Sequence, residues 1–261
     1  MKKTLETMIK FFREIRKNLL MENKTGKYLK YAIGEIVLVV IGILIALSIN
    51  NWNDNRKNKL AESDYYCRIL EDFQINEKLV NESLEGITNR IKISKKIILD
   101  LNKTPNNKSE ILNDFLHALR QNVFVPSNIT FEELTSSGNI KFITDIQLKN
   151  RLIEFNTFLE NTLDLLKENR NELNKRMINF ESATEFGMQE FDYLENELGK
   201  EIGQLLPSNE WTNNKNDKTF LKFQDNLVFL VAMYVRQKQH LYNLKVEMEE
   251  PIRLLKNKKC E

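Results

Sequence analysis

The hydrophobic positions divide the chain into one uniformly apolar stretch and several longer segments with helical periodicity. Every residue from Ile36 to Leu47 is apolar or glycine, and the flanks out to Tyr31 and Trp52 extend the stretch to 22 residues. A helix rises about 1.5 Å per residue, so this length covers a hydrocarbon core of roughly 30 Å. Aromatic residues at both ends suit the headgroup regions. The pattern predicts one transmembrane helix over 31–52.

Downstream of Trp52 the apolar residues recur at alternating spacings of four and three, the heptad spacing of a long helix. The predicted seam comprises Tyr66, Leu70, Phe73, Glu77, Val80, Leu84, Ile87, Ile91, Ser94, Ile98 and Leu101. A dimeric coiled coil and a long bundle helix both fit this seam. Because further helices follow, the bundle helix is favoured. Turn-forming residues at 102–109 are expected to end it.

The middle of the chain is predicted to contain short helices and a reversal. Ser109 is a candidate cap for a helix through about Gln121. Thr130 and Glu133 form a candidate capping box for the next helix. Gly138 then fits a change of chain direction.

Two more long helices are expected. The first starts at Asp145 and runs to about Leu198, with a kink allowed near Gly187. After an expected mobile loop at 199–217, the second starts near Lys218. This last helix contains the apolar run 226–235, which is too short to span a bilayer and is expected to be fully buried in the bundle. Pro251 is expected to end or kink the helix.

These elements make the predicted fold class all-α. The expected organisation is a basic amphipathic head on the cytoplasmic side (1–30), a transmembrane helix (31–52) and a bundle of long helices (53–261). Only 8 glycines and 4 prolines in 261 residues leave few turn signals for a β-rich fold.

The charge is distributed unevenly. Residues 1–30 carry nine Lys and Arg against three acidic residues, and the totals of 39 basic and 37 acidic residues leave 30 and 34 for residues 31–261. The head is therefore +6 and the rest −4, which favours an anionic membrane surface over nucleic acid as the partner of the head. Five apolar residues recur at helical spacing there: Leu5, Met8, Phe12, Ile15 and Leu19. They predict an interfacial helix, with packing against a partner's helix as the alternative.

The basic residues near the span also predict its orientation. The N-terminal flank holds Arg16, Lys17, Lys24, Lys27 and Lys30, whereas the other flank holds Arg56, Lys57 and Lys59. The positive-inside rule then places the N-terminus in the cytoplasm and the bundle outside it, in the periplasm where the cell has two membranes. A secretory signal peptide cleaved near Ala46-Leu47-Ser48 is the competing interpretation, disfavoured by the length of the preceding region.

Two longer motifs carry a family resemblance. The segment MIKFFREIRKNLLMENKTGKYLKYAIGEIVLVVIGILIALSINNWNDNRK resembles the N-terminal signature of a bacterial family of uncharacterised single-pass membrane proteins, a domain of unknown function. The segment TFEELTSSGNIKFITDIQLKNRLIEFN is similar to that family's central motif. The resemblance implies a single-pass membrane protein and brings no activity with it.

Candidate site residues lie in the apolar stretch. Gly42 and Ala46 follow Glu35 by 7 and 11 residues, so all three share one helical face within about 20°. Small residues four apart let two helices approach closely, and a carboxyl on that face can be protonated or hydrogen-bonded across the contact. The sequence therefore predicts a membrane helix interface at these residues. The alternative is that Glu35 reaches the headgroups and marks the boundary of the span.

Other candidate chemistry is sparse. Cys67 and Cys260 form no CxxC motif and are expected to be unpaired thiols, with a bridge possible in an oxidising compartment. Asp114 with His117, and Gln237 with His240, give at most half of a carboxylate-histidine metal site. The common nucleophile, zinc and phosphate-binding motifs do not occur. No cofactor and no enzymatic activity are expected.

The sequence thus favours a membrane-anchored helical interaction or scaffold protein. Its expected partners are the lipid membrane and either further copies of the chain or another membrane or periplasmic protein. A ligand-sensing module acting through a separate cytoplasmic partner is one alternative. A subunit of an oligomeric channel or transport assembly, with Glu35 lining a pore, is another.

Overall fold

The computed structural model describes residues 10, 13–14, 17, 25–120, 123–177, 182–206 and 209–258. Within these ranges the chain forms seven α-helices and three short 3-10 helices, with no strand, as the all-α prediction requires. The elements are α2 (Thr25–Leu101), α3 (Lys108–Leu119), α4 (Ile129–Ser136), η1 (Asn139–Phe142), α5 (Ile146–Met177), α6 (Ala183–Phe186), η2 (Met188–Glu190), α7 (Asp192–Leu205), η3 (Trp211–Asn213) and α8 (Lys218–Lys256). The apolar residues of the predicted interfacial helix lie outside the described residues.

The chain divides into two compact units, Met1–Ala61 and Glu62–Glu261. Helix α2 runs through the boundary between them without interruption. The part of α2 in the first unit contains the apolar stretch, whose side chains are exposed. The part in the second unit contributes to a buried core.

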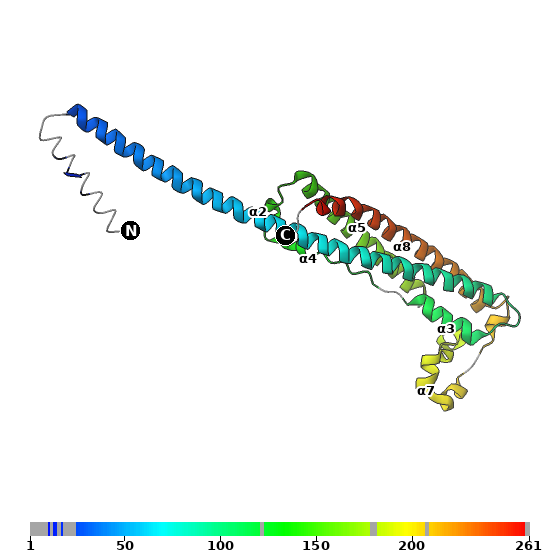
Figure 1. Cartoon of the computed structure of the whole chain (residues 1–261). Coiled ribbons are helices and arrows are strands. Elements are labelled where there is room, and N and C mark those ends of the chain that lie inside the picture. The colour runs from blue at the N-terminus through cyan, green and yellow to red at the C-terminus, as the bar shows by residue number, and fades with distance from the viewer. Residues whose placement is uncertain are drawn as a thin grey trace. The chain divides into compact units, whose positions relative to one another are not determined.

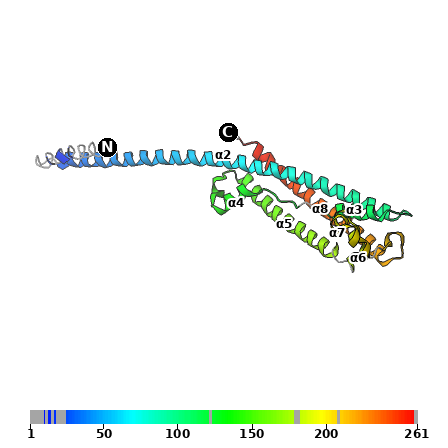
Figure 2. The same ribbon diagram turned by 90° about the horizontal axis from the view of Figure 1, so that it is seen from below.

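Three long helices frame the second unit: α2 from Glu62 onward, α5 and α8 run side by side (Figure 1, Figure 2). The rings of Phe73 in α2 and Phe155 in α5 have centroids 4.6 Å apart. Lys245 Nζ in α8 donates to Asn81 in α2 at 2.8 Å. Glu62 and Phe73 of α2 contact Thr144 and Phe155, so α2 and α5 run parallel. Asn81 and Arg90 of α2 contact Lys245 and Tyr234, so α8 is antiparallel to both.

The buried face of α2 follows the predicted seam over most of its length. Tyr66, Phe73, Val80, Ile87, Ser94 and Leu101 are buried. Leu70, Leu84, Ile91 and Ile98 are half-buried, while Glu77 is exposed. Ile69 and Ile97, outside the predicted seam, are buried as well. Because α2 packs against more than one helix, it buries a wider stripe than the narrow seam of a two-stranded coiled coil.

The chain returns from the far end of α2 through α3 and an extended segment. Asn107, rather than the predicted Ser109, caps α3, because its side chain accepts a hydrogen bond from the Glu110 N–H at 3.3 Å. At the other end of α3, the hydroxyl of Tyr234 donates to the Ala118 carbonyl. The guanidinium of Arg90 donates to the Arg120 carbonyl at 3.3 Å. Both groups satisfy carbonyls that a helix end leaves unpaired.

The predicted capping box at the start of α4 is wrong. The helix begins after Asn128, and the N–H of Thr130 donates to the carboxylate of Asp72 in α2 at 3.0 Å. Glu133 instead bonds to residues of α2. A tertiary partner thus replaces the local cap. The predicted reversal is confirmed, since Gly138 adopts a left-handed φ of 70° that a residue with a Cβ rarely adopts.

The helix that begins after Asp145 is described to Met177 and does not reach the predicted Leu198, because Ser182 is already extended. Asp145 caps it as expected, accepting from the Leu148 N–H at 3.0 Å. From Ala183 to Leu205 the chain forms α6, η2 and α7. Gly187, where a kink was predicted, ends α6 with a φ of 98°.

The expected mobile loop at 199–217 is only partly a loop. Helix α7 continues across a kink at Gly199 to Leu205. Trp211 in η3 is fully buried, and its indole N–H donates to the Phe186 carbonyl at 2.8 Å. This aromatic anchor holds the segment against the core.

Helix α8 starts at Lys218, as predicted, but differs from expectation in two respects. It continues through Pro251 to Lys256, because proline removes one hydrogen bond near the helix end while Ile252 and Leu255 remain buried beyond it. The apolar run 226–235 is not buried on all sides. Leu227, Leu230 and Tyr234 are fully buried, whereas Val228 and Val235 are 57% and 54% exposed.

Candidate functional site

The apolar stretch of α2 is the most distinctive feature of the first unit. Among the described helices, α2 is the one long and apolar enough to cross a membrane. Its large apolar side chains are exposed, from Ile36 at 63% to Leu47 at 53%. Such a surface is larger than soluble proteins leave uncovered.

The three predicted interface residues lie in this stretch. The helix is continuous from Thr25 through all of them, so the 7 and 11 residue offsets keep Glu35, Gly42 and Ala46 on one face. Glu35 is half-buried, whereas Gly42 and Ala46 are exposed. A Cβ added at Gly42 would meet no atom within 4 Å. This face is therefore open to a second helix.

A second group of residues was not predicted. We call it the polar cluster; it comprises Glu62, Tyr65, Tyr66, Arg68, Glu133, Asn139 and Thr144. It joins the start of the second unit's part of α2 to α4, η1 and the segment before α5. The cluster thus ties together stretches up to 82 residues apart in sequence.

Glu62 is the centre of the first half of the polar cluster. Its carboxylate accepts hydrogen bonds from the Tyr66 hydroxyl at 2.6 Å and from the Thr144 N–H and hydroxyl at 2.7 and 2.6 Å. Burial raises the pKa of Glu62, but the hydrogen bonds from Thr144 and Tyr66 together lower it by more than burial raises it. The pKa of Glu62 is therefore below the ordinary 4.5. Burial, then the bond to Glu62, raises the pKa of Tyr66. The carboxylate is held ionised and the phenol neutral.

Glu133 is the centre of the other half. It accepts from the guanidinium of Arg68 and from the hydroxyl of Tyr65 at 3.2 Å. The bond from Arg68 lowers the pKa of Glu133. Asn139 in turn donates to the Tyr65 hydroxyl at 2.9 Å. Glu133, Asn139 and Thr144 all lie within residues 130–156, the second of the two longer motifs in the sequence.

The end of α8 adds two connections nearby. Lys258 Nζ lies 2.6 Å from the carboxylate of Asp145 and 5.4 Å from the centre of the Tyr66 ring.

Cys67 is disulfide-bonded, so the prediction of an unpaired thiol is wrong at this position. The other cysteine of the sequence, Cys260, lies outside the described residues. The carboxylates of the cluster are engaged by donors of the same chain, so the arrangement acts as a connection between elements.

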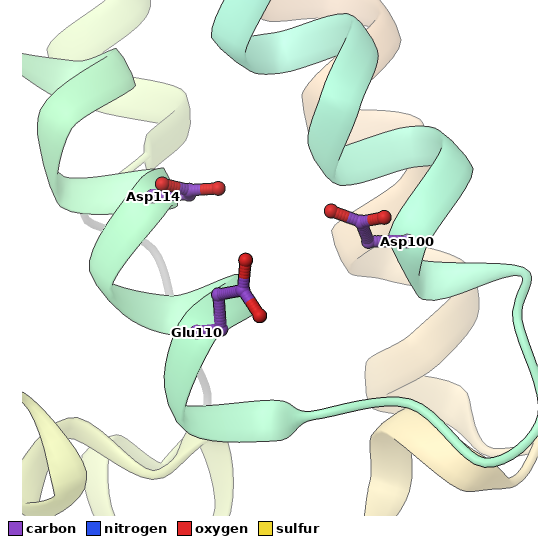
Figure 3. A group of neighbouring side chains, drawn as sticks. All are labelled: Asp100, Glu110 and Asp114. Carbon is purple, nitrogen blue, oxygen red and sulfur yellow. The ribbon is translucent and has the colours of Figure 1, made fainter.

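Three carboxylates gather at the opposite end of α2. Figure 3 shows Glu110 and Asp114 of α3 pointing toward Asp100 of α2, and their oxygens lie within 4.8 Å of one another. The ammonium of Lys96 lies 2.8 Å from Glu110, 2.6 Å from Asp114 and 3.6 Å from Asp100. The bonds to Asp114 and then Glu110 raise the pKa of Lys96. Lys96, together with Lys103 at 2.5 Å from Asp100, supplies the positive charge that a metal ion would bring.

The two histidines do not extend this group. His117 is exposed, one turn beyond Asp114. His240 is half-buried, and its buried Nε2 has no hydrogen-bond partner. Burial, and then the charge of Arg236, lowers the pKa of His240. Among the described residues, the carboxylate group at Asp100 is the one set with metal-ligand spacing, and it includes neither histidine.

Comparison with known families adds one match. Residues 35–96 match DUF6090, a family of unknown function. The matched region begins at Glu35, crosses the rest of the apolar stretch and covers most of the α2 part of the second unit. It supports the resemblance to a domain of unknown function. No curated protein and no solved structure matches the sequence.

Proposed function

We propose that this chain is a membrane-anchored interaction protein. The apolar stretch of α2 crosses the cytoplasmic membrane, and residues 53–261 form an extracytoplasmic helical bundle that binds further copies or another protein. The observation that carries the proposal is the contrast within α2, where exposed apolar residues at 31–52 continue directly into a helix with a buried core face.

An uncleaved anchor is favoured over a signal peptide. The candidate cleavage site Ala46-Leu47-Ser48 lies inside α2, and the helix continues from there to Leu101. A signal peptidase needs an accessible site after a short apolar core, which a continuous helix does not offer.

Two observations support an extracytoplasmic bundle. The flank directly before the span holds five basic residues and the flank directly after it three, which favours a cytoplasmic N-terminus. Cys67 is disulfide-bonded, and structural disulfides persist in oxidising compartments such as the periplasm.

Topology can be tested by cysteine labelling in intact spheroplasts. We expect a membrane-impermeant thiol reagent to label Asn213→Cys and to leave Glu22→Cys unlabelled until the cells are lysed. The reverse pattern would overturn the extracytoplasmic assignment. Native Cys67 is disulfide-bonded and offers no thiol to the reagent, so the unmodified chain gives the baseline for both variants.

The membrane interface needs a separate test, since Glu35 could mark only the boundary of the span. In-membrane crosslinking should be largely preserved by Glu35→Gln, less specific in Glu35→Leu, and disrupted in Gly42→Leu because the larger side chain separates the backbones. The matched control is Gly34→Leu, another glycine with open surroundings that points about 100° away from Glu35. An unchanged oligomer in Gly42→Leu would leave Glu35 as a boundary residue.

A further inference from the structure

A small hollow lies between α5, α8 and the segment that precedes α4. Its volume is about 60 Å³. We call it the α5–α8 hollow, and the residues that line it are Val123, Phe124, Leu163, Leu166, Lys167, Arg170 and Gln237. All of them belong to the second unit, so the hollow is formed without any contribution from the apolar stretch of α2.

The walls of the α5–α8 hollow are mainly apolar. Phe124 and Leu166 are 8% and 9% exposed and belong to the buried core, and Leu163 packs against that core. Val123 is 60% exposed and therefore marks the side on which the hollow meets solvent. Apolar walls with a few polar groups are typical of small-molecule sites. An alkyl group placed against these walls would remove apolar surface from water.

Two cationic side chains line the hollow from α5. Lys167 and Arg170 are three residues apart and therefore lie on the same helical face. Lys167 is exposed and Arg170 is half-buried. Among the described residues neither side chain forms an ion pair, and none of the residues that line the hollow is acidic. Both cations therefore remain available to an anion.

Gln237 of α8 is the residue that indicates a ligand. Its side chain is 8% exposed, and its buried amide oxygen has no hydrogen-bond partner within the part of the chain that the structure describes. Because the oxygen is the enclosed end, the amide nitrogen is the end left for the hollow, with two N–H donors. A buried amide without a partner is unfavourable, so a ligand that accepts a hydrogen bond here is stabilising.

Contacts beside the hollow fix the relative positions of these donors. The side-chain amide of Asn169, the neighbour of Arg170, donates to the Met233 carbonyl at 3.1 Å. Met233 lies one turn before Gln237 on α8. This bond holds α5 against α8 next to the hollow. Donors that are already positioned lose less conformational freedom when a ligand binds.

We propose that the α5–α8 hollow binds a short-chain carboxylate. The carboxylate oxygens would lie at Lys167, Arg170 and Gln237, and the alkyl group against the apolar walls. A guanidinium can bind a carboxylate through two parallel hydrogen bonds. The volume equals that of about two water molecules at roughly 30 Å³ each, so the hollow admits a carboxylate with a very short alkyl group, such as propionate. This binding activity goes beyond the proposed function and does not depend on the membrane anchor.

Saturation-transfer difference NMR on the full chain in deuterated detergent micelles tests the site, with propionate as the probe. The alkyl protons of propionate should receive saturation from the protein. Arg170→Gln should raise the dissociation constant by about tenfold or more, because a charge-assisted hydrogen bond is lost. The matched control is Arg236→Gln, which removes the same charge from an exposed position outside the hollow and should change nothing. No saturation transfer, or equal weakening in both variants, would overturn the inference.

A second variant separates loss of the contact from loss of the fold. Lys167 is exposed, so Lys167→Gln should leave the circular dichroism spectrum unchanged and still weaken propionate binding. An unchanged dissociation constant in this variant would overturn the proposed contact.

Competition identifies the class of ligand. At matched ionic strength, inorganic phosphate should displace propionate only at about tenfold higher concentration or more, because it has no apolar group to place against the walls. Equal competition by phosphate would overturn the assignment to a carboxylate. A failure of propionate binding with normal Asn213→Cys labelling would leave the proposed function intact, whereas reversed labelling would overturn the proposed function and not the site.

Discussion

The two units of the chain use the same residue types in opposite environments. Leu44 in the apolar stretch of α2 is 56% exposed, while Leu230 in α8 is fully buried. Leu230 lies in a core built from three long helices of its own chain. Leu44 has no such cover within the described chain. An apolar pattern therefore tells which side chains leave water, but the surrounding structure decides whether protein or lipid replaces the water.

Helix α8 shows an intermediate case, with Leu221, Val228, Val235 and Tyr242 exposed. Its inner face is part of the core, and its outer face resembles the uncovered stretch of α2. The contrast between the two units thus predicts three kinds of response to substitution.

The largest difference is expected for matched leucine truncations. Leu230→Ala should lower the free energy of unfolding of the second unit by about 2–5 kcal/mol, through lost transfer energy and the cavity left behind. Leu44→Ala should leave that free energy unchanged. Denaturant unfolding of the full chain in detergent micelles, followed by circular dichroism, measures both. Equal effects of the two substitutions would contradict the separation into two units.

Much of this architecture was predictable because it depends on local periodicity. The apolar stretch, the end of α2 near 102 and the start of α8 at Lys218 follow from spacing and turn residues. The predicted capping box at Thr130 failed because Asp72, 58 residues earlier, supplies the partner. Helix ends set by tertiary contacts cannot be found from neighbours in sequence.

A smaller effect is expected at the polar cluster. Glu62→Gln should destabilise the second unit by about 1 kcal/mol at neutral pH, because the amide replaces a charged acceptor of three hydrogen bonds. The pKa of Glu62 is lowered in the folded state, so its stabilisation is present above 4.5 and is lost as the pH falls through the folded pKa. Urea midpoints of both proteins should therefore converge below pH 4.5.

The matched control for this prediction is Glu82→Gln. Glu82 is exposed and pairs only loosely with Lys78 at 3.9 Å. Glu82→Gln should have the same urea midpoint as the unmodified chain, both at neutral pH and below pH 4.5. If the urea midpoints of Glu62→Gln and the unmodified chain still differ in acid, the carboxylate charge is not the source of the difference.

The candidate site was predictable only in part. Glu35, Gly42 and Ala46 could be placed on one face because a helix turns by a fixed angle per residue. The polar cluster could not, because its pairs, such as Glu62 with Thr144, join positions 82 residues apart. The paired state of Cys67 was missed for the same reason. Periodicity describes one helix at a time, whereas these contacts depend on how the helices are arranged.

The smallest effect is expected at the carboxylates of Asp100, Glu110 and Asp114. It tests whether lysine side chains of the second unit neutralise these carboxylates in place of a metal ion. Lys96→Ala should cost below about 1 kcal/mol, because the pairs are partly exposed. Without the Lys96 ammonium, Glu110 and Asp114 lose their cation while Lys103 still pairs with Asp100, and the group offers oxygen ligands suited to Ca²⁺. Millimolar Ca²⁺ should therefore raise the Tm of Lys96→Ala while leaving the unmodified chain unchanged. Lys78→Ala, which removes a cation beside a single carboxylate, should not respond to Ca²⁺. A comparable rise in the unmodified chain would mean that these carboxylates bind a metal ion despite Lys96, and that the second unit takes up a cation from solution.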